Sequence, residues 1–398
     1  MERGILESNG RGGDSGGPAG EAMRRVSIAP RPDWQKKVER AGLTWHSGQQ
    51  PYWNESAFYE FTAGEVSVLE AATNELDKMT LAAAQHIIDH HLYGKLGIPE
   101  AAVPLIESSW KAEPPALYGR FDLAYDGAGP PKLLEYNADT PTSLVEAAVV
   151  QWHWLEEVFP RRDQFNSLHQ RLIALWKELA PCLPGGRIDF CSMDDAEDGM
   201  TVTYLQDTAQ QAGLAASVFP IDEIGWNGAA FVGPDDRPLG AIFKLYPWEW
   251  MVREEFGRHL GKDATVWIEP PWKMLLSNKG ILPVLWQLYP RHPYLLEASF
   301  DGPGLMMAWV KKPLLGREGA NITVHQPGKE IATPGNYGAE GFIYQDYAPL
   351  KNFDGKYPVL GSWLIGHEEG NAAGGMGIRE SDTPVTTNAS QFVPHLFD

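Results

Sequence analysis

The sequence is poor in cysteine and has no long hydrophobic run. Only Cys182 and Cys191 are present, which is too few for a disulfide scaffold or a thiolate metal site. Neither lies in a recognisable nucleophile context, so a thiol-dependent hydrolase is not supported. Because so few cysteines fit a reducing compartment, we expect a cytoplasmic protein. No stretch reaches the ~18 consecutive apolar residues of a membrane helix, so we expect no membrane association.

Basic residues are also scarce, with 33 Lys and Arg against 52 Asp and Glu and a net charge of −19. Such a charge repels nucleic acid and anionic membrane surfaces. It favours a cationic partner such as a polyamine, although solubility alone also explains it. The first 22 residues are rich in Gly, Ser and Glu and lack the apolar segment of a signal peptide. We expect residues 1–30 to be disordered and residues 31–398 to form the folded protein.

The remaining chain mixes helical and extended patterns, which predicts a fold of the α+β or α/β class. Apolar residues spaced three or four apart predict helices over 64–93, 143–158, 165–180 and 201–212. Short extended segments predict strands over 118–127, 131–139, 187–192, 216–220, 229–233 and 239–247. Ser143 is expected to cap the second helix. Gly- and Pro-rich turns between four further extended segments predict an antiparallel sheet in the last third.

Two extended segments joined by a DGAGPP turn, YGRFDLAYDG and LLEYNADTPTS, carry closely spaced polar residues. Side chains alternate between the faces of a strand, so Arg120 and Asp122 should point the same way, as should Glu135 and Asn137. Pairing of the strands would then gather Asp122, Glu135 and Asn137 around a hard cation such as Mg²⁺, which prefers oxygen ligands. From spacing alone, a polar turn with capping residues explains segment 133–143 equally well.

Arg120 and the residues after the second strand indicate where anions would bind. Arg120 would neutralise charge on a transferring phosphoryl or acyl-phosphate group. Thr140, Thr142 and Ser143 offer hydroxyl and backbone donors at an expected helix start, which is a natural anion site.

The C-terminal half adds separated lysines and glycine-rich turns. Lys279 and Lys311 would reach phosphates, and Lys311 precedes the glycine turn of LLGREGAN, although a solvated lysine explains either residue as well. Gln345 lies in a segment suited to an adenine edge. The stretch GHEEGNAAGGMGIRES, which contains Arg379, would form a mobile lid-like loop or a phosphate cradle. The Trp-rich segment FKLYPWEWM would pack in the core or wall a substrate cleft.

Taken in order, these motifs resemble the glutathionylspermidine synthase family. The segments that carry the resemblance are YGRFD, LLEYNADTPTS, YLQDTAQQAG, FKLYPWEWM, EPPWKMLLSNKGILPVLWQLYP, VKKPLLGREGANI and GIRES. They look most like the family's stand-alone acid–amine ligases, and the likeness runs from about Trp34 to the C-terminus. Bifunctional members have an N-terminal cysteine amidase, for which we find no counterpart in this sequence, so we do not expect hydrolysis of the product.

The resemblance implies an ATP-grasp fold with a pre-ATP-grasp-like subdomain, in which two lobes enclose ATP. It divides the chain into a magnesium-ligand segment at 118–143, an α/β middle at 185–247 and C-terminal ATP-grasp lobes at 265–398. ATP and Mg²⁺ are the implied cofactors.

The resemblance also implies residue roles. Arg120 would stabilise the transition state. The metal ligands would be Asp122, Glu135 and Asn137. The nucleotide site would include Arg120, Asp122, Lys279, Lys311, Glu318, Gln345 and, on a closing C-terminal loop, Arg379. The acid substrate or its amine acceptor would lie near Thr140, Thr142 and Glu197.

The implied chemistry is ATP-dependent ligation of a carboxylate to an amine. ATP would phosphorylate the carboxylate, and the amine would then attack the acyl phosphate. The acid would be a peptide or a glutathione-like molecule, and the amine a small amine or a polyamine. Two alternatives remain open. One is a non-catalytic ATP- or peptide-binding module that acts with a partner, and the other is an ATP-dependent kinase that stops at the phosphorylated product.

Overall fold

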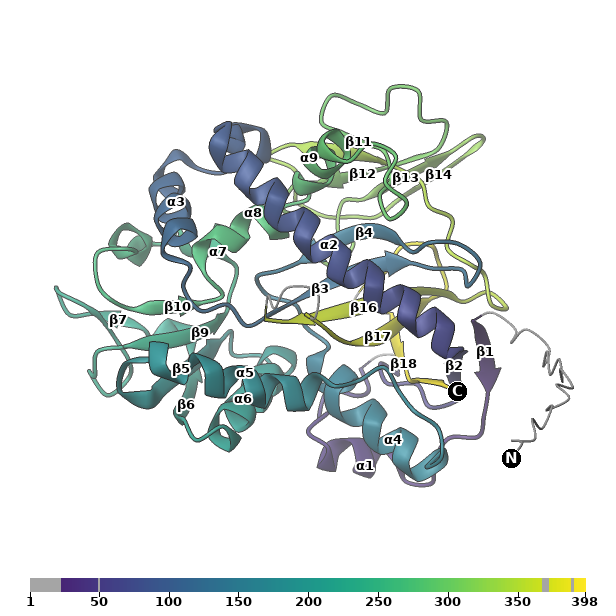
Figure 1. Ribbon diagram of the computed structural model, residues 1–398, viewed down its shortest axis with the longest axis horizontal. Helices are drawn as coiled ribbons and strands as arrows, with labels where there is room; N and C mark the ends of the chain where they lie inside the picture. The colour runs from purple at the N-terminus through teal and green to yellow at the C-terminus, as the bar shows by residue number, and fades with distance from the viewer. Residues whose placement is uncertain (1–22, 49–50, 367–371, 388–389) are drawn as a thin grey trace, which may run out of the picture.

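The computed structural model describes residues 23–48, 51–366, 372–387 and 390–398, and these form a mixed α/β fold (Figure 1). Residues 1–22, which belong to the stretch expected to be disordered, lie outside the described residues. The expectation is wrong for the residues that follow, because Arg24–Ser27 form strand β1. β1 pairs with β2 (Ala57–Phe61), and β2 also pairs with the last strand, β19 (His395–Phe397). Segments from the two ends of the chain therefore lie in one small sheet.

A five-stranded antiparallel sheet lies at the centre of the fold. Its strands, in spatial order, are β18 (Gln391–Val393), β17 (Ala373–Ser381), β16 (Tyr357–Ile365), β3 (Tyr118–Ala124) and β4 (Lys132–Asn137). Helix α2 (Ala63–Asp89) crosses one face of this sheet, as Figure 1 shows. The Thr73 hydroxyl on α2 lies 2.6 Å from the Ser362 hydroxyl on β16. The predicted long helix is thus confirmed, although it ends at Asp89 and a 3₁₀ turn over Leu92–Leu96 follows.

A four-stranded parallel sheet forms the middle region. Its order is β10 (Val266–Ile268), β9 (Ala241–Leu245), β5 (Arg187–Ser192) and β6 (Ala215–Pro220). Helix α6 (Ala196–Gln211) connects β5 to β6, which confirms the predicted strand–helix–strand rhythm. The strand predicted over 229–233 does not join this sheet. Only Phe231–Val232 (β8) are extended there, and they pair with β7 (Gly225–Trp226) in a separate ribbon.

The antiparallel sheet predicted for the last third of the chain is divided in the structure, because β16–β19 join the central sheet and the small sheet, while residues 298–346 form a second antiparallel sheet of five strands. Its order is β11 (Ala298–Ser299), β15 (Phe342–Asp346), β12 (Trp309–Pro313), β13 (Thr323–Gln326) and β14 (Lys329–Ala332). The remaining α-helices are α1 (Trp34–Arg40), α3 (Val103–Ala112), α4 (Gln151–Val158), α5 (Leu168–Leu179), α7 (Trp248–Met251), α8 (Met274–Ser277) and α9 (Ile281–Leu288). Within the described part of the chain, no helix is both long and apolar enough to cross a membrane.

The helix predicted over 143–158 differs in its start from the expectation. Ser143 does not cap it, because its backbone has a left-handed φ of 70° and its hydroxyl lies 3.0 Å from the Tyr52 hydroxyl. A π-helical turn, Glu146–Val150, precedes α4. By contrast, α6 begins five residues before its predicted start, since the Asp195 carboxylate accepts hydrogen bonds from the amides of Glu197 and Asp198, both at 3.0 Å.

Two fully buried ion pairs join the central sheet to the parallel sheet. Lys244 on β9 lies 2.6 Å from Asp139, which follows β4. Lys273 pairs with Glu269, whose carboxylate accepts the amides of Leu117 and Tyr118 at 3.0 Å, at the start of β3. A buried ion pair whose remaining hydrogen bonds are satisfied fixes geometry rather than adding much net stability. These pairs therefore set where the β3–β4 hairpin sits.

We predict that Glu269→Leu lowers the free energy of unfolding by about 3–5 kcal/mol, because it leaves Lys273 buried and unpaired. Urea denaturation followed by circular dichroism measures this loss. Glu255→Leu is the matched control, because Glu255 forms an exposed pair with Arg258, and its effect should stay within about 0.5 kcal/mol. Equal effects in the two variants would contradict this account of the hairpin's anchor.

Candidate active site

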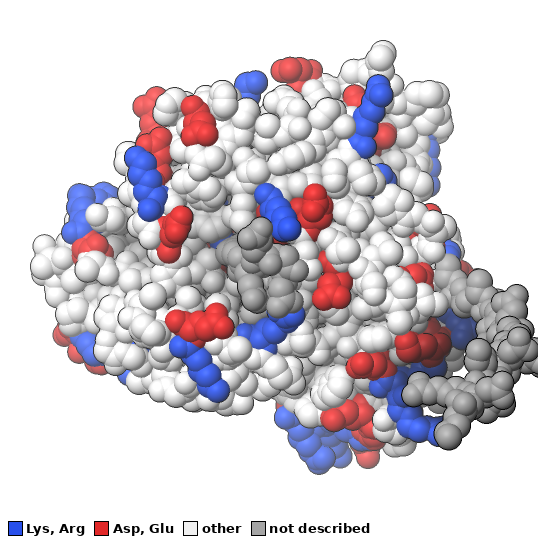
Figure 2. All heavy atoms as spheres, in the orientation of Figure 1, with Lys and Arg blue, Asp and Glu red and all other residues white. Residues whose placement is uncertain are grey.

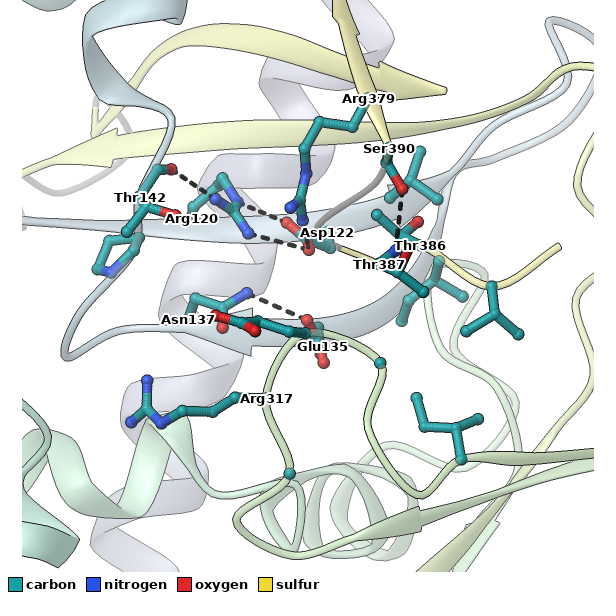
Figure 3. Close-up of a pocket in the computed structure, with 18 of the residues that line it drawn as sticks. Arg120, Asp122, Glu135, Asn137, Thr142, Arg317, Arg379, Thr386, Thr387 and Ser390 are labelled. Atoms are coloured by element: carbon teal, nitrogen blue, oxygen red, sulfur yellow. Dashed lines mark hydrogen bonds and ion pairs between the residues drawn. The ribbon is translucent and has the colours of Figure 1, made fainter. Parts of the chain in front are cut away.

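The β3–β4 hairpin presents four polar side chains on one face. In the antiparallel register Arg120 lies opposite Asn137, and Asp122 lies opposite Glu135. The prediction that these four side chains share a face of the sheet is therefore confirmed, since residues two apart on a strand, and residues directly opposite, point the same way. Figure 3 shows all four at one cavity.

Arg120 is buried and held from two directions. Its guanidinium donates to both oxygens of Asp122, at 2.7 and 3.1 Å, and to the backbone carbonyl of Thr142 at 2.6 Å. The neighbouring strand makes room for this side chain at Gly361, where a Cβ would lie 2.8 Å from Cδ of Arg120. Arg379 approaches the same carboxylate, with a nitrogen–oxygen distance of 3.4 Å.

Glu135 lies among basic groups. Its carboxylate lies 2.9 Å from the ammonium of Lys279 and accepts a hydrogen bond from the Asn137 amide at 3.3 Å. Burial alone would raise the pKa of Glu135, but the ammonium groups of Lys279 and Lys312 outweigh it and hold this pKa well below its usual range. Glu135 is therefore ionised, and ionised carboxylates are suitable metal ligands.

The donor chemistry of this cluster fits magnesium. Asp122 and Glu135 offer carboxylate oxygens and Asn137 offers an amide oxygen, the hard ligands that Mg²⁺ prefers together with water and phosphate. Among all the residues that the structure describes, no group of three or more His, Cys, Asp or Glu side chains could hold a metal. The set would thus leave several coordination positions to water and substrate.

The strand β12 places a different lysine in the cavity from the one predicted. Lys311 does not line it, because its ammonium lies over the ring of Phe342, 4.1 Å from the centroid. Lys312, the next residue, points to the other face and donates to Gln345 Oε1 at 2.7 Å and to the Leu134 carbonyl at 2.8 Å. Burial lowers the pKa of Lys312 to about 8. Sequence reasoning missed Lys312, since the alternation that would have separated the two lysines needs the strand's orientation.

Lys279 does not line the cavity either. Its ammonium donates to the carbonyl of Gly316 at 2.6 Å and pairs with Glu135. Lys279 therefore ties strand β4 to the LLGREGAN loop.

The LLGREGAN loop forms part of the cavity wall through Glu318 and its neighbours. Glu318 and Gly319 have left-handed φ angles of 54° and 68°. A Cβ at Gly319 would lie 2.4 Å from the carbonyl of Thr386, so this glycine permits close contact with the segment after β17. Arg317, which sequence reasoning did not select, donates to Thr140 and Glu249, both at 2.7 Å, while its buried Nε has no hydrogen-bond partner among the described residues.

Arg379 is not on a closing loop as predicted. It lies on strand β17, where the backbone pairs with both β16 and β18. Residues 367–371 of the predicted lid-like loop lie outside the described residues. The glycines of GGMG lie in this strand. They are glycines because neighbouring atoms leave no room for a side chain. A Cβ at Gly377, for example, would lie 2.7 Å from the Phe392 ring.

A further part of the cavity wall, the acidic end, is acidic and aromatic. Thr140, Thr142 and Glu197 line it, as do the newly found Asp195, Asp198, Trp45 and Trp250. Burial raises the pKa of Glu197, and burial together with Asp195 and Glu197 raises that of Asp198 to about 7. In the FKLYPWEWM segment, Trp248 is buried in the core and Trp250 lines the cavity.

The whole cavity has a volume of about 440 Å³ and lies between the central sheet, the second antiparallel sheet and the start of α6. It joins three chemically distinct parts: oxygen donors with arginines, an apolar slot with Lys312 and Gln345, and the acidic end. Outside it, acidic and basic side chains are scattered over the face seen in Figure 2.

Residues 25–398 match the family described as glutathionylspermidine synthase preATP-grasp, and the chain belongs to this family. Its relatives confirm the predicted enzyme class, an ATP-dependent carbon–nitrogen ligase.

Three curated relatives illustrate the match. A Haemophilus influenzae protein named "Putative acid--amine ligase" is 44% identical over 398 residues, which cover 94% of this chain and 100% of that protein. Trypanothione synthetase from Crithidia fasciculata is 30% identical, covering 78% of this chain and 52% of that protein. The bifunctional glutathionylspermidine synthetase/amidase of Escherichia coli is 27% identical, covering 87% and 59%. The chain spans somewhat more than half of the last two proteins.

A solved structure supports the fold. The glutathione synthetase-like effector GSS30 from Globodera pallida superposes with a TM-score of 0.51 at 10% sequence identity, covering 92% of this chain and 98% of that one.

The raised pKa of Asp198 predicts a pH-dependent stability. Unfolded Asp releases its proton near pH 4 and folded Asp198 near pH 7, so the folded state loses stability as pH rises through this window. Asp198→Asn should therefore unfold at higher urea concentration than the parent at pH 8. The gain, on the order of 1–2 kcal/mol after allowance for partial exposure, should grow from pH 4 to 7 and then level off. The exposed neighbour Asp194 gives the control, Asp194→Asn. A gain that does not vary with pH would contradict this prediction.

Proposed function

We propose that this protein joins a carboxylate to an amine with ATP, through an acyl phosphate, and that its central cavity is the active site. The observation that carries the proposal is that one cavity is lined both by oxygen donors with arginines and by a group of acidic residues, Asp195, Glu197 and Asp198. A polyphosphate needs the first, and an ammonium needs the second. The alternative of a non-catalytic binding module has no need of this arrangement.

The nucleotide would occupy the side of the cavity formed by the second antiparallel sheet. Val310, Ile322 and Val324 give apolar contacts for an adenine ring, and the Gln345 amide lies at their edge. Lys312 would pair with a phosphate, since its buried ammonium faces this space. This placement agrees with an ATP-grasp arrangement, in which residues 265–398 supply the lobes that hold ATP.

Asp122, Glu135 and Asn137 would hold Mg²⁺, whose charge offsets that of the phosphates. Arg120 and Arg379, both at Asp122, are placed to stabilise negative charge on a phosphoryl group during its transfer. Arg317 would orient a carboxylate of the acid substrate, because its Nε has no hydrogen-bond partner among the described residues.

The amine would bind at the acidic end, beside Thr140, Thr142 and Glu197. Glu197 and Asp198 attract an ammonium, and Trp45 and Trp250 can cover its methylene chain. An ammonium must lose a proton before it attacks an acyl phosphate. Asp198, with a pKa of about 7, is suited to accept that proton. A polyamine and a glutathione-like peptide, the substrates named for the relatives, fit these two parts of the cavity in charge.

The test is ADP release with peptide acids and polyamines supplied singly and together, followed by mass spectrometry of the product. We expect release to require both substrates and an ATP-dependent product equal in mass to their sum minus water. Release with the acid alone and a stable phosphorylated product would establish the kinase instead. Nucleotide binding without release for any mixture would support the binding module.

We predict that Asp122→Ala abolishes ADP release while the protein remains folded, because Asp122 is both a proposed metal ligand and the partner of Arg120. The thermal unfolding transition checks the fold. Asp207→Ala, on the outer part of α6, is the control and should keep full activity. An active Asp122→Ala protein would remove Asp122 from the metal site.

Adjacent lysines give a sharper comparison. Lys312→Met should weaken binding of the ATP analogue AMPPNP at least about tenfold, because a charged hydrogen bond contributes roughly 1.5–3 kcal/mol. Lys311→Met should change it less than about twofold, since Lys311 points away from the cavity. Isothermal titration calorimetry measures both. The reverse order would place the nucleotide on the other face of β12.

A further inference from the structure

The two carboxylates proposed as metal ligands are both already engaged by basic side chains. Arg120 donates to both oxygens of Asp122, at 2.7 and 3.1 Å, and Arg379 lies 3.4 Å from the same group. Lys279 lies 2.9 Å from Glu135. Figure 3 shows the two arginines converging on Asp122 from different strands. Three side-chain cations are therefore already paired with the two carboxylates that would attract a divalent ion.

These pairs are held by the fold and not by chance contact. Asp122 and Arg120 are buried, and Arg120 is also fixed by the Thr142 carbonyl at 2.6 Å. Lys279 is likewise anchored at the Gly316 carbonyl, at 2.6 Å. Even Asn137, the third proposed ligand, turns its amide nitrogen toward Glu135. A divalent ion that enters alone must take the place of these side-chain cations at the carboxylates. The displaced guanidinium and ammonium groups stay nearby because they are anchored, and their positive charge repels the ion and opposes its binding.

A nucleotide changes this balance. Its phosphates carry several negative charges and offer the oxygens that guanidinium and ammonium groups bind well. Once the phosphates engage Arg120 and Arg379, Asp122 becomes free to bind a cation, and the like-charge repulsion falls. At Glu135 the negative charge of the phosphates likewise offsets the positive charge of Lys279, which stays at the Gly316 carbonyl and does not line the cavity.

We propose that Arg120, Arg379 and Lys279 act as internal counter-ions that keep the metal ligands occupied, so that the divalent cation binds strongly only together with the nucleotide. The inference rests on the metal and nucleotide sites of the proposed function. It assigns Lys279 to positioning and charge balance instead of a phosphate contact. It also makes a prediction opposite to the usual effect of mutating an active site. Removing a counter-ion should strengthen metal binding.

The test is a titration with Mn²⁺, followed by electron paramagnetic resonance, with and without AMPPNP and in the absence of any acid or amine. The parent protein should bind Mn²⁺ about tenfold or more tightly with the nucleotide than without it. Arg120→Gln and Lys279→Met should each bind Mn²⁺ alone about fivefold more tightly than the parent, and the gain from the nucleotide should shrink. Arg379→Gln should show a smaller gain, because its contact with Asp122 is longer.

Arg237→Gln is the matched control, since Arg237 pairs at 3.0 Å with the buried carboxylate of Asp189, which does not line the cavity. It should bind Mn²⁺ like the parent. Equal Mn²⁺ affinity with and without nucleotide in the parent, or unchanged or weaker binding in the counter-ion variants, would overturn the proposal. If Arg120→Gln does not fold, Lys279→Met and Arg379→Gln decide.

Failure of this proposal and failure of the ligase proposal are distinguishable. The titration contains no acid or amine, so a protein without ligase activity can still pass it. Conversely, Asp122→Asn should lose Mn²⁺ binding in both conditions, which tests the metal assignment by itself. If the protein is an active ligase but its Mn²⁺ affinity does not change when Arg120 or Lys279 is replaced, only the counter-ion proposal is refuted.

Discussion

The register of the β3–β4 hairpin is the constraint on which the rest of the site depends. With Asp122 opposite Glu135 and Arg120 opposite Asn137, four polar groups meet on one face. A slip of one residue would turn the strand's side chains to the opposite face and disperse them. Glu269, paired with Lys273, holds the start of β3 by binding two backbone amides. Strand β16 pairs with the other edge of β3 and so fixes the hairpin from that side.

The hairpin also connects the site to the parallel sheet. Asp139, which sequence alternation would have placed on the face of Glu135, leaves the strand and pairs with Lys244. Its other oxygen accepts the Trp248 amide at 2.9 Å. This buried pair, with the Trp248 amide, joins the segment of Thr140 and Thr142 to the start of α7, which carries Trp250.

Much of this was predictable because it depends on local pattern. Strand alternation in YGRFD and LLEYN, helical spacing over α2 and the β5–α6–β6 rhythm all express short-range preferences. Family resemblance, confirmed by the match over residues 25–398, supplied the enzyme class. Features that depend on distant neighbours were missed. Which of Lys311 and Lys312 faces the cavity is set by pairing with β15. The glycines near Arg379 suggested a loop because their crowded neighbours, Leu168 at Gly374 and Gly375 and Phe392 at Gly377, come from other segments of the chain.

In the proposed function, the cation and the nucleotide meet at the β3–β4 hairpin. Crystals grown with Mn²⁺ and AMPPNP test it directly, because the anomalous signal of manganese locates the ion independently of any assumed mechanism. The account predicts one peak about 2.0–2.4 Å from oxygens of Asp122, Glu135 and Asn137 and from the phosphates. A peak at the acidic end, between Asp195 and Asp198, with no ion at the hairpin would contradict it.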